Sequence, residues 1–236
     1  MPLPPQTTRS RLTSQKTVTP TPLDTEGVRL FWSDKRRNQA LYSARTTSAA
    51  YLERVKGVLQ EYQDGVGLAE EGASRDEITQ GRARARMQML EELQRLGITD
   101  GAPGDSNRIT DLAASIRLNL ILETNAQVMH SLDMVQSRSD PVVRAAYPAW
   151  EFVRDEHRNE PRDWGNRWNE SAADVGWVGV ARNTPRMIAL CDSPIWARLG
   201  SYPDGLGNPF PPFSFGSGMG WEHVSAEEAE QLDFGR

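Results

Sequence analysis

The chain has 236 residues and a formal net charge of −5 at pH 7, and 38% of its residues are hydrophobic and 25% charged. This length suits one medium domain or two small ones. The negative charge argues against a protein that binds nucleic acid over its whole surface, and it leaves open a local basic patch. The single cysteine, Cys191, excludes an intramolecular disulfide framework and a cysteine-based zinc cluster.

Two kinds of membrane or export signal are absent from the pattern of apolar residues. No run approaches the roughly 20 apolar residues of a membrane span. The first residues also lack the apolar core of a secretory signal. We therefore expect a soluble protein that is made in the reducing cytoplasm and has no membrane partner.

Residues 1–25 are rich in Pro, Thr, Ser and Gln and contain no aromatic residue. Such a composition is typical of a disordered tail, because it buries too little surface to offset the entropy of ordering. If the segment is ordered, we expect an extended N-terminal arm held by neighbouring chains. Arg9, Arg11 and Lys16 make it mildly basic and are its candidate partner-binding residues.

Residues 26–140 have a helical pattern and form the expected helical domain. Apolar residues recur at three- and four-residue spacing up to about Gly65. A second helix is predicted from Ser74 to Leu96, with Ser74 and Glu77 as a capping box and Gly97 as the C-terminal cap. A third, from about Ile109 to Val135, is apolar on more than one face and is expected to be largely buried.

Three arginines, Arg82, Arg84 and Arg86, lie in the middle of the second predicted helix. Charges that alternate along a helix usually form a solvated face. The alternative is contact with phosphate groups or with an acidic partner. We keep the three arginines as candidate partner-binding residues.

Residues 141–236 form the third expected part, a Trp- and Pro-rich α+β module. Six of the seven tryptophans lie between Trp150 and Trp221. A strand is predicted within 147–156, a short helix after Ser193, and a final short helix with Ser225 as its N-cap. The fold class expected for the whole chain is α+β, with long helices followed by this loop-rich module.

The segment VRDEHRNEPRDWGNRW, residues 153–168, mixes arginines, carboxylates and tryptophans. As an active site, it would use His157 or Glu160 as an acid or base and its arginines as phosphate clamps. We favour a structural network of ion pairs and Trp-stacked arginines, because no nucleophile or oxyanion site is evident. The network residues are Arg154, His157, Arg158, Arg162, Asp163, Trp164 and Trp168.

No catalytic, metal-binding or cofactor-binding residue is assigned, and the protein is not expected to be an enzyme. The sequence contains no phosphate-binding P-loop motif and no G-x-S-x-G nucleophile motif. Cys191 has no basic neighbour in sequence, so we interpret it as a small buried residue. His130 and His223 are interpreted as structural.

The stretch NPFPPFSFGSGM, residues 208–219, combines three Phe with three Pro and no charge. The prolines favour an extended backbone, and Phe210, Phe213 and Phe215 can each bury a large apolar area. We favour a strap over a Trp-rich core. The alternative is a docking surface for a partner, with the three Phe as candidate contacts.

Four pieces of the sequence, in this order, resemble the Mu F-like head-morphogenesis (minor head protein) family of tailed bacteriophages and prophages. They are RLNLILETNAQVMHS, YPAWEFVRDEHRNEPRDWGNRW, RMIALCDSPIWARLG and DGLGNPFPPFSFGSGM, within residues 109–232. Leu122, Asn125 and Val128 approximate the family's helical element, and Arg158 and Arg162 occupy its basic turn. This chain departs from the family in lacking the R-P-x-H and C-R-C pieces, so a metal or redox role is not carried over.

The resemblance implies a structural virion protein of the head or portal region that supports head assembly, genome packaging or delivery. Its partners would be the portal or major capsid protein, and packaged DNA through local basic patches. Two alternatives remain open at this stage. One is a small nuclease-like or toxin-like enzyme that uses His157, Arg158, Glu160 and Arg162. The other is a head–tail connector or capsid decoration protein.

Overall fold

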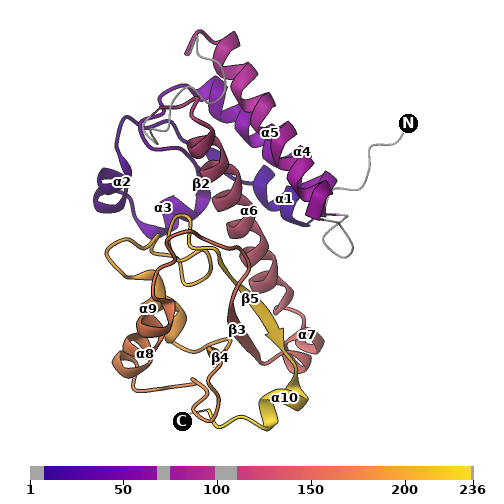
Figure 1. Cartoon of the computed structure of the whole chain (residues 1–236), viewed down its shortest axis with the longest axis vertical. Helices are drawn as coiled ribbons and strands as arrows, with labels where there is room; N and C mark the ends of the chain where they lie inside the picture. The colour runs from indigo at the N-terminus through magenta and orange to yellow at the C-terminus, as the bar shows by residue number, and fades with distance from the viewer. Residues whose placement is uncertain (1–7, 68–74, 99–110, 235–236) are drawn as a thin grey trace. The chain divides into compact units, whose positions relative to one another are not determined.

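The computed structural model describes residues 8–67, 75–98 and 111–234. The chain divides into two compact units, Met1–Met129 and His130–Arg236. The fold is α+β, as predicted, with two small sheets among mostly helical elements (Figure 1). The division falls within α6 (Ser115–Ser137), before the boundary at residue 140 expected from composition. Arg138, just after α6, places its guanidinium 5.4 Å from the ring centre of Trp150 in the second unit.

The first unit contains most of the helices. They are α1 (Thr8–Ser14), α2 (Thr25–Phe31), α3 (Asp34–Gln39), α4 (Ala49–Gly67), α5 (Arg75–Arg95) and the first part of α6. Two short strands, β1 (Thr17–Val18) and β2 (Ala40–Leu41), pair in parallel. The helical pattern before Gly65 is interrupted because Asp24 and Ser33 accept backbone hydrogen bonds and start α2 and α3 separately.

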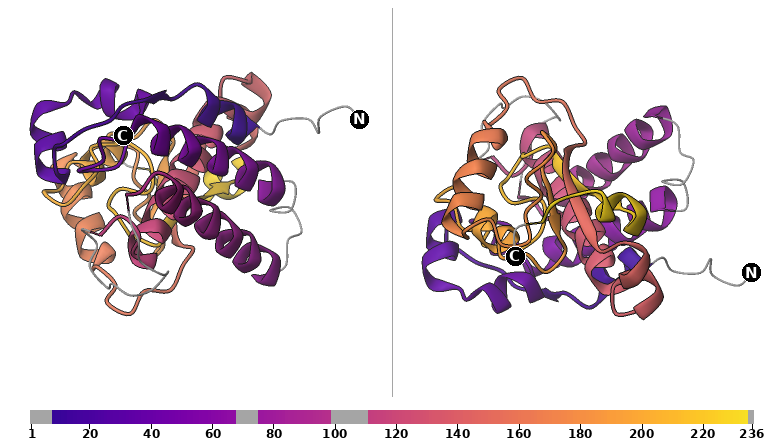
Figure 2. Two further views of the ribbon diagram at one scale, coloured as in Figure 1. Left: turned by 90° about the horizontal axis from the view of Figure 1, so that it is seen from above. Right: turned by 90° about the horizontal axis from the view of Figure 1, so that it is seen from below.

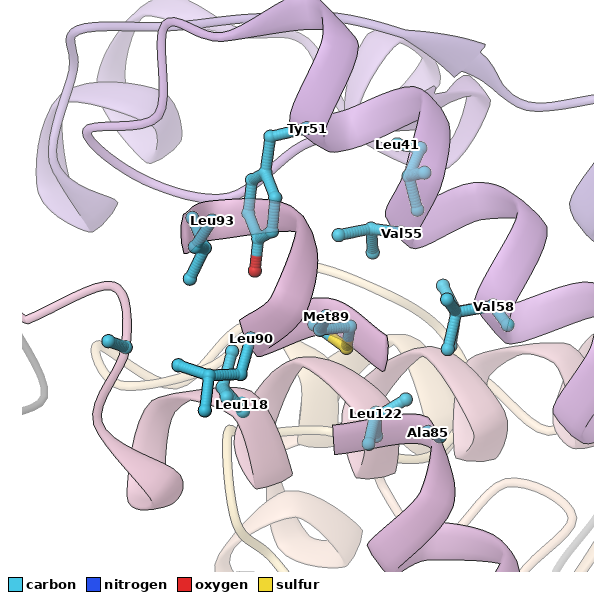
Figure 3. Packing of buried hydrophobic residues seen from close by; sticks show 12 residues of the cluster. Leu41, Tyr51, Val55, Val58, Ala85, Met89, Leu90, Leu93, Leu118 and Leu122 are labelled. Carbon is cyan, nitrogen blue, oxygen red and sulfur yellow. The ribbon is translucent and has the colours of Figure 1, made fainter. Parts of the chain in front are cut away.

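Long helices α4 and α5 lie side by side and form the core of the first unit (Figure 1 and Figure 2). Tyr51, Val55 and Val58 of α4 face Met89 and Leu93 of α5 (Figure 3). The core also includes residues of β2 and α6, namely Leu41, Leu118 and Leu122. Apolar side chains at helical spacing on each element explain this packing, since each helix turns one stripe inward.

The C-terminal end of α5 confirms its predicted cap. Gly97 has a φ of +64°, and its N–H donates to the carbonyl of Gln94, while the N–H of Ile98 donates to the carbonyl of Leu93. This pair of bonds is a Schellman motif, which glycine favours because the position is left-handed. The other predicted end, the capping box at Ser74 and Glu77, lies outside the described side chains.

The second unit is built on a three-stranded antiparallel sheet. Its strands lie in the order β4 (Ile188–Leu190), β3 (Ala149–Arg154) and β5 (Met219–Val224). In the register, Trp150 is opposite Ala189 on β4 and His223 on β5. The right-hand view of Figure 2 shows β3 and β5 next to each other. The predicted strand within 147–156 is confirmed as β3.

Four helices accompany this sheet: α7 (Pro141–Ala146), α8 (Trp164–Asp174), α9 (Ile195–Gly200) and α10 (Ala226–Glu230). The predicted helix after Ser193 is α9, and Ser225 caps α10 by accepting a hydrogen bond from the N–H of Glu228. Within the described residues, no helix combines the length and apolar character needed to cross a bilayer.

The described part of the N-terminal segment, residues 8–25, differs from the extended arm predicted for residues 1–25. Residues 8–14 form α1, which packs on α4 with Leu12 buried, and Thr13 donates a 2.6 Å hydrogen bond to Gln63. β1 pairs with β2, and Thr21 pairs with Thr46. The prediction was wrong because it weighed composition alone. The burial of Leu12 and the hydrogen bond from Thr13 to Gln63 hold α1 in place, because α4 provides the surface on which α1 packs.

Candidate functional site

Aromatic side chains from β3, β5, α8, α9 and the segment around Phe213 meet in one core. The rings of Trp150 on β3 and Trp221 on β5 are stacked with their centroids 3.8 Å apart. Trp196 on α9 meets Trp221 edge-on at 5.0 Å and Trp168 of α8 at 5.6 Å. Edge-on and offset contacts of this kind add to the stabilisation from area burial. We call this set the aromatic core; its members are Trp150, Phe152, Trp164, Trp168, Trp196, Phe213 and Trp221.

The stretch 208–219 is a strap over this core, as favoured from the sequence. Phe213 is fully buried, and its ring lies 5.3 Å from that of Phe152. The strap fits closely, since a Cβ added at Gly200 would lie 1.9 Å from the carbonyl oxygen of Asn208. Burial of Phe210 and Phe213 contradicts their assignment as partner contacts, because neither side chain is accessible to a partner. Phe215 is half-buried.

Arg162 of the predicted network and Arg167 of the same segment converge on one carboxylate, Asp204, that sequence reasoning missed. Arg162 donates to Asp204 at 2.7 Å, and Arg167 donates to both oxygens of Asp204 at 3.0 and 3.2 Å. Burial works to raise the pKa of Asp204, but the hydrogen bonds from Arg167 and Arg162 outweigh it and bring the pKa below its ordinary value. The guanidinium of Arg167 also lies 5.1 Å from the ring centre of Trp164 and 4.8 Å from that of Tyr202.

This arrangement ties α8 to the loop after α9. Asp163 caps α8 by accepting a hydrogen bond from the N–H of Asn166. Arg198 of α9 stacks on Tyr202 at 4.7 Å and pairs with Asp174 at 2.6 Å. Asp204 lies 37 to 42 residues from the arginines it binds, so no local pattern points to it.

The remaining residues proposed for the network lie around the loop after β3. Arg158 pairs with Glu156 at 2.8 Å, with both side chains mostly covered. Arg154, His157 and Glu160 are exposed. Arg162 and Asp163 thus directly precede α8, whereas Trp164 and Trp168 lie on α8 and belong to the aromatic core. His157 lies at the surface.

Asp155 is the most perturbed carboxyl group of this loop. One of its oxygens lies against Gly220, where an added Cβ would be only 1.8 Å away, although the residue as a whole is exposed. Burial, and then repulsion from Glu222 and Glu156, raise the pKa of Asp155 to about 6. Its N–H donates to the carbonyl of Gly218, so the loop is held against the strap.

Cys191 and His223, both interpreted as structural from the sequence, each lie against Tyr147. Cys191 is buried, its Sγ lies 3.6 Å from the carbonyl oxygen of Tyr147, and burial raises the pKa of its thiol to about 12. Burial lowers the pKa of His223, whose ring lies 4.8 Å from that of Tyr147. Among the described residues, no group of three or more His, Cys, Asp or Glu is arranged to hold a metal ion.

The cations proposed in the N-terminal segment are placed differently from one another. Arg11 is exposed. Lys16 is buried, and burial lowers its pKa to about 8, which contradicts its assignment as a partner contact. Its carbonyl accepts a 2.8 Å hydrogen bond from the Lys56 ammonium. The side chain of Arg9 lies outside the described part.

The three arginines of α5 are also divided by the fold. Arg82 donates to the hydroxyl of Tyr62 at 3.4 Å and lies 3.8 Å from Glu123 of α6. Arg86 is half-buried, and Arg84 is exposed. Because Arg82 is engaged within the unit, only part of the proposed basic face is presented to solvent.

Sequence reasoning also missed a buried arginine in the first unit. Arg117 donates to the Ser43 hydroxyl at 2.9 Å, to the carbonyl of Ala44 and to the Thr46 hydroxyl at 3.3 Å. It thereby holds the loop between β2 and α4, in which Arg45 has a φ of +58°. The partners are more than 70 residues away in sequence, so no local pattern indicates the role of Arg117.

Comparison with known proteins gives no relative. No family model, no curated protein and no solved structure matches this chain.

Proposed function

We propose that the protein is a structural minor head protein of a tailed bacteriophage, bound to the portal or capsid and supporting head assembly, genome packaging or delivery. It would be made in the host cytoplasm and reside in the virion, in the head or portal region. The proposal rests on the resemblance described above and on the way the pieces that carry it fold.

The supporting observation is that three of those four pieces contribute to one aromatic core. The piece beginning at Tyr147 supplies Trp150, Phe152, Trp164 and Trp168. The piece around α9 supplies Trp196, and the strap supplies Phe213. The pieces follow the order found in the family, and they also pack against one another. They therefore form a single module and are not unrelated short segments. A rigid module of this kind suits a protein that holds a position in an assembly.

The charged residues of the same module favour a structural role over an enzymatic one. An enzyme of the nuclease or toxin kind would need its arginines available to a phosphate. Arg158 instead pairs with Glu156, and Arg162 shares Asp204 with Arg167. The two pairs of Asp204 join segments that lie 37 to 42 residues apart in sequence, which is what a structural network does.

Particle composition tests the proposal. We expect mass spectrometry to find the protein in purified heads or in assembly intermediates, in no more copies than the portal has subunits. A deletion mutant is the control and should yield defective heads or heads that package or deliver poorly. Absence of the protein from both heads and intermediates would contradict the proposal, whereas hundreds of copies would favour a decoration protein.

A nucleic-acid cleavage assay tests the enzymatic alternative directly. Wild type and His157→Ala are incubated with RNA and with DNA in the presence of several divalent metals. We expect neither protein to cleave. Cleavage by the wild type that is lost in His157→Ala would show an enzyme and overturn the structural proposal.

A further inference from the structure

Short helix α2 leaves two large apolar side chains in solvent. Its inner face buries Val28, which packs with Trp32 and Ala40 in a small local cluster. Its outer face carries Leu30 and Phe31, which are 72% and 74% exposed. Single exposed apolar residues are ordinary, but two large adjacent ones form a patch of the kind that marks a contact surface.

Exposed cations lie next to this apolar pair, at the start of α3. Lys35 and Arg36 are both exposed, and the Arg36 guanidinium lies 4.2 Å from the ring centre of Trp32. Arg37 is used differently, since it donates to the carbonyls of Arg29 and Trp32 and fixes the turn between the helices. We call Leu30, Phe31, Lys35 and Arg36 the α2–α3 corner.

The opposite charge is concentrated near the end of the chain. The stretch from Glu222 to Asp233 holds five carboxylates and no lysine or arginine. Glu228 of α10 pairs with Arg186. By contrast, Glu227, Glu230 and Asp233 are exposed, and no basic group pairs with them in the part of the chain that the structure describes. We call these three residues the α10 acidic face.

We infer that the α2–α3 corner docks on the α10 acidic face of a second copy of this chain. The argument is charge complementarity: the corner is basic within a chain whose net charge is −5, so another copy presents it with an acidic surface. The apolar pair supplies the centre of the contact and the charges its rim, which is the usual anatomy of a protein interface.

A contact between two different surfaces of identical chains is head-to-tail when each pair of copies makes it once. Such contacts close into a ring or continue as a filament, because each copy keeps one surface free for the next. The inference does not depend on the proposed function. Association is measured on the purified protein, whereas the function is tested by the composition of particles, so each can fail alone.

Sedimentation velocity over a wide concentration range tests the docking. We expect the wild type to associate as its concentration rises and to dissociate as salt is raised, because exposed charges are screened. Phe31→Ser should weaken association about ten-fold or more, as loss of a central aromatic contact does. The matched control is Val142→Ser on α7, since Val142 is equally exposed at 74% and should have no effect. A wild type that stays monomeric throughout overturns the inference.

Charge reversal identifies the two surfaces. One variant carries Lys35→Glu and Arg36→Glu, and the other carries Glu227→Lys and Glu230→Lys. Neither should associate alone, and an equal mixture should, because each supplies the surface that the other has lost. Circular dichroism establishes that both are folded, and Arg144→Glu controls for a change of net charge. Association of the second variant alone would show that α10 is not the counterpart and would overturn the inference.

Discussion

Tyr51 shows at the scale of one residue how an apolar core can contain an unpaired polar group. The side chain is fully buried between α4 and α5, where burial raises the pKa of its hydroxyl (Figure 3). Its hydroxyl has no hydrogen-bond partner among the described residues. A buried hydroxyl without a partner loses its hydration and gains nothing in return.

Replacing Tyr51 by Phe should therefore stabilise the protein. We expect Tyr51→Phe to raise the free energy of unfolding by about 1 kcal/mol, because the ring is kept and the unpaired hydroxyl is removed. Urea unfolding measures the change. Tyr62→Phe is the control and should not stabilise, since the Tyr62 hydroxyl accepts a hydrogen bond from Arg82. A less stable Tyr51→Phe would mean that the hydroxyl is satisfied in solution.

Asp155 makes stability depend on pH. Its folded pKa, about 6, lies above the unfolded value, so the native state holds the proton more tightly. This group therefore contributes stability at low pH, and that contribution is lost as pH rises from about 4 to 6. Above that range, the Asp155 carboxylate is charged and is repelled by Glu222 and Glu156, which destabilises the folded state.

Asp155→Asn removes this titration and tests the assignment. We expect the variant to gain in melting temperature over the wild type at pH 7.5 and to gain much less at pH 4.5. Scanning calorimetry at both values provides the comparison. A gain that is equal at the two pH values would show that Asp155 has an ordinary pKa.

Elements differed in how far their local sequence determined them. Helix α5 ends at its predicted glycine and α10 begins at its predicted serine, because both signals act through backbone bonds within one turn. Helix α8 was missed, although Trp164, Trp168 and Ala172 recur at four-residue spacing and Asp163 caps it. The charged residues that surround these three positions in sequence made the apolar face of the helix hard to recognise. The N-terminal segment was misjudged because its partner surface lies on α4.

Removing residues 1–25 tests the new view of the N-terminal segment. The deletion takes away α1, β1 and the pairing of Thr21 with Thr46, and it exposes the side of α4 on which α1 packs. We expect a clear loss in melting temperature. Leu12→Ala should destabilise by about 2 kcal/mol, as expected for a buried leucine. Unchanged melting of the truncated chain would restore the interpretation as an arm that does not contribute to the core.

On the scale of the whole molecule, the two units differ in the kind of order that holds them. The first is stabilised by aliphatic packing between helices and by Arg117. The second combines a three-stranded sheet and short helices with stacked rings, a close strap and ion pairs. The α2–α3 corner and the α10 acidic face belong to different units. A head-to-tail assembly would therefore use both units of every copy.

The sequence by itself determined the α+β class, the strand β3, the caps of α5 and α10, and the aromatic character of the second half. These features depend on residues close together in the chain. Only the tertiary structure decided that Phe213 lies at the centre of the core, that Asp204 joins Arg162 and Arg167, and that Lys16 is buried. Each depends on a partner tens of residues away, and composition and spacing carry no information about which distant groups the folded chain brings into contact.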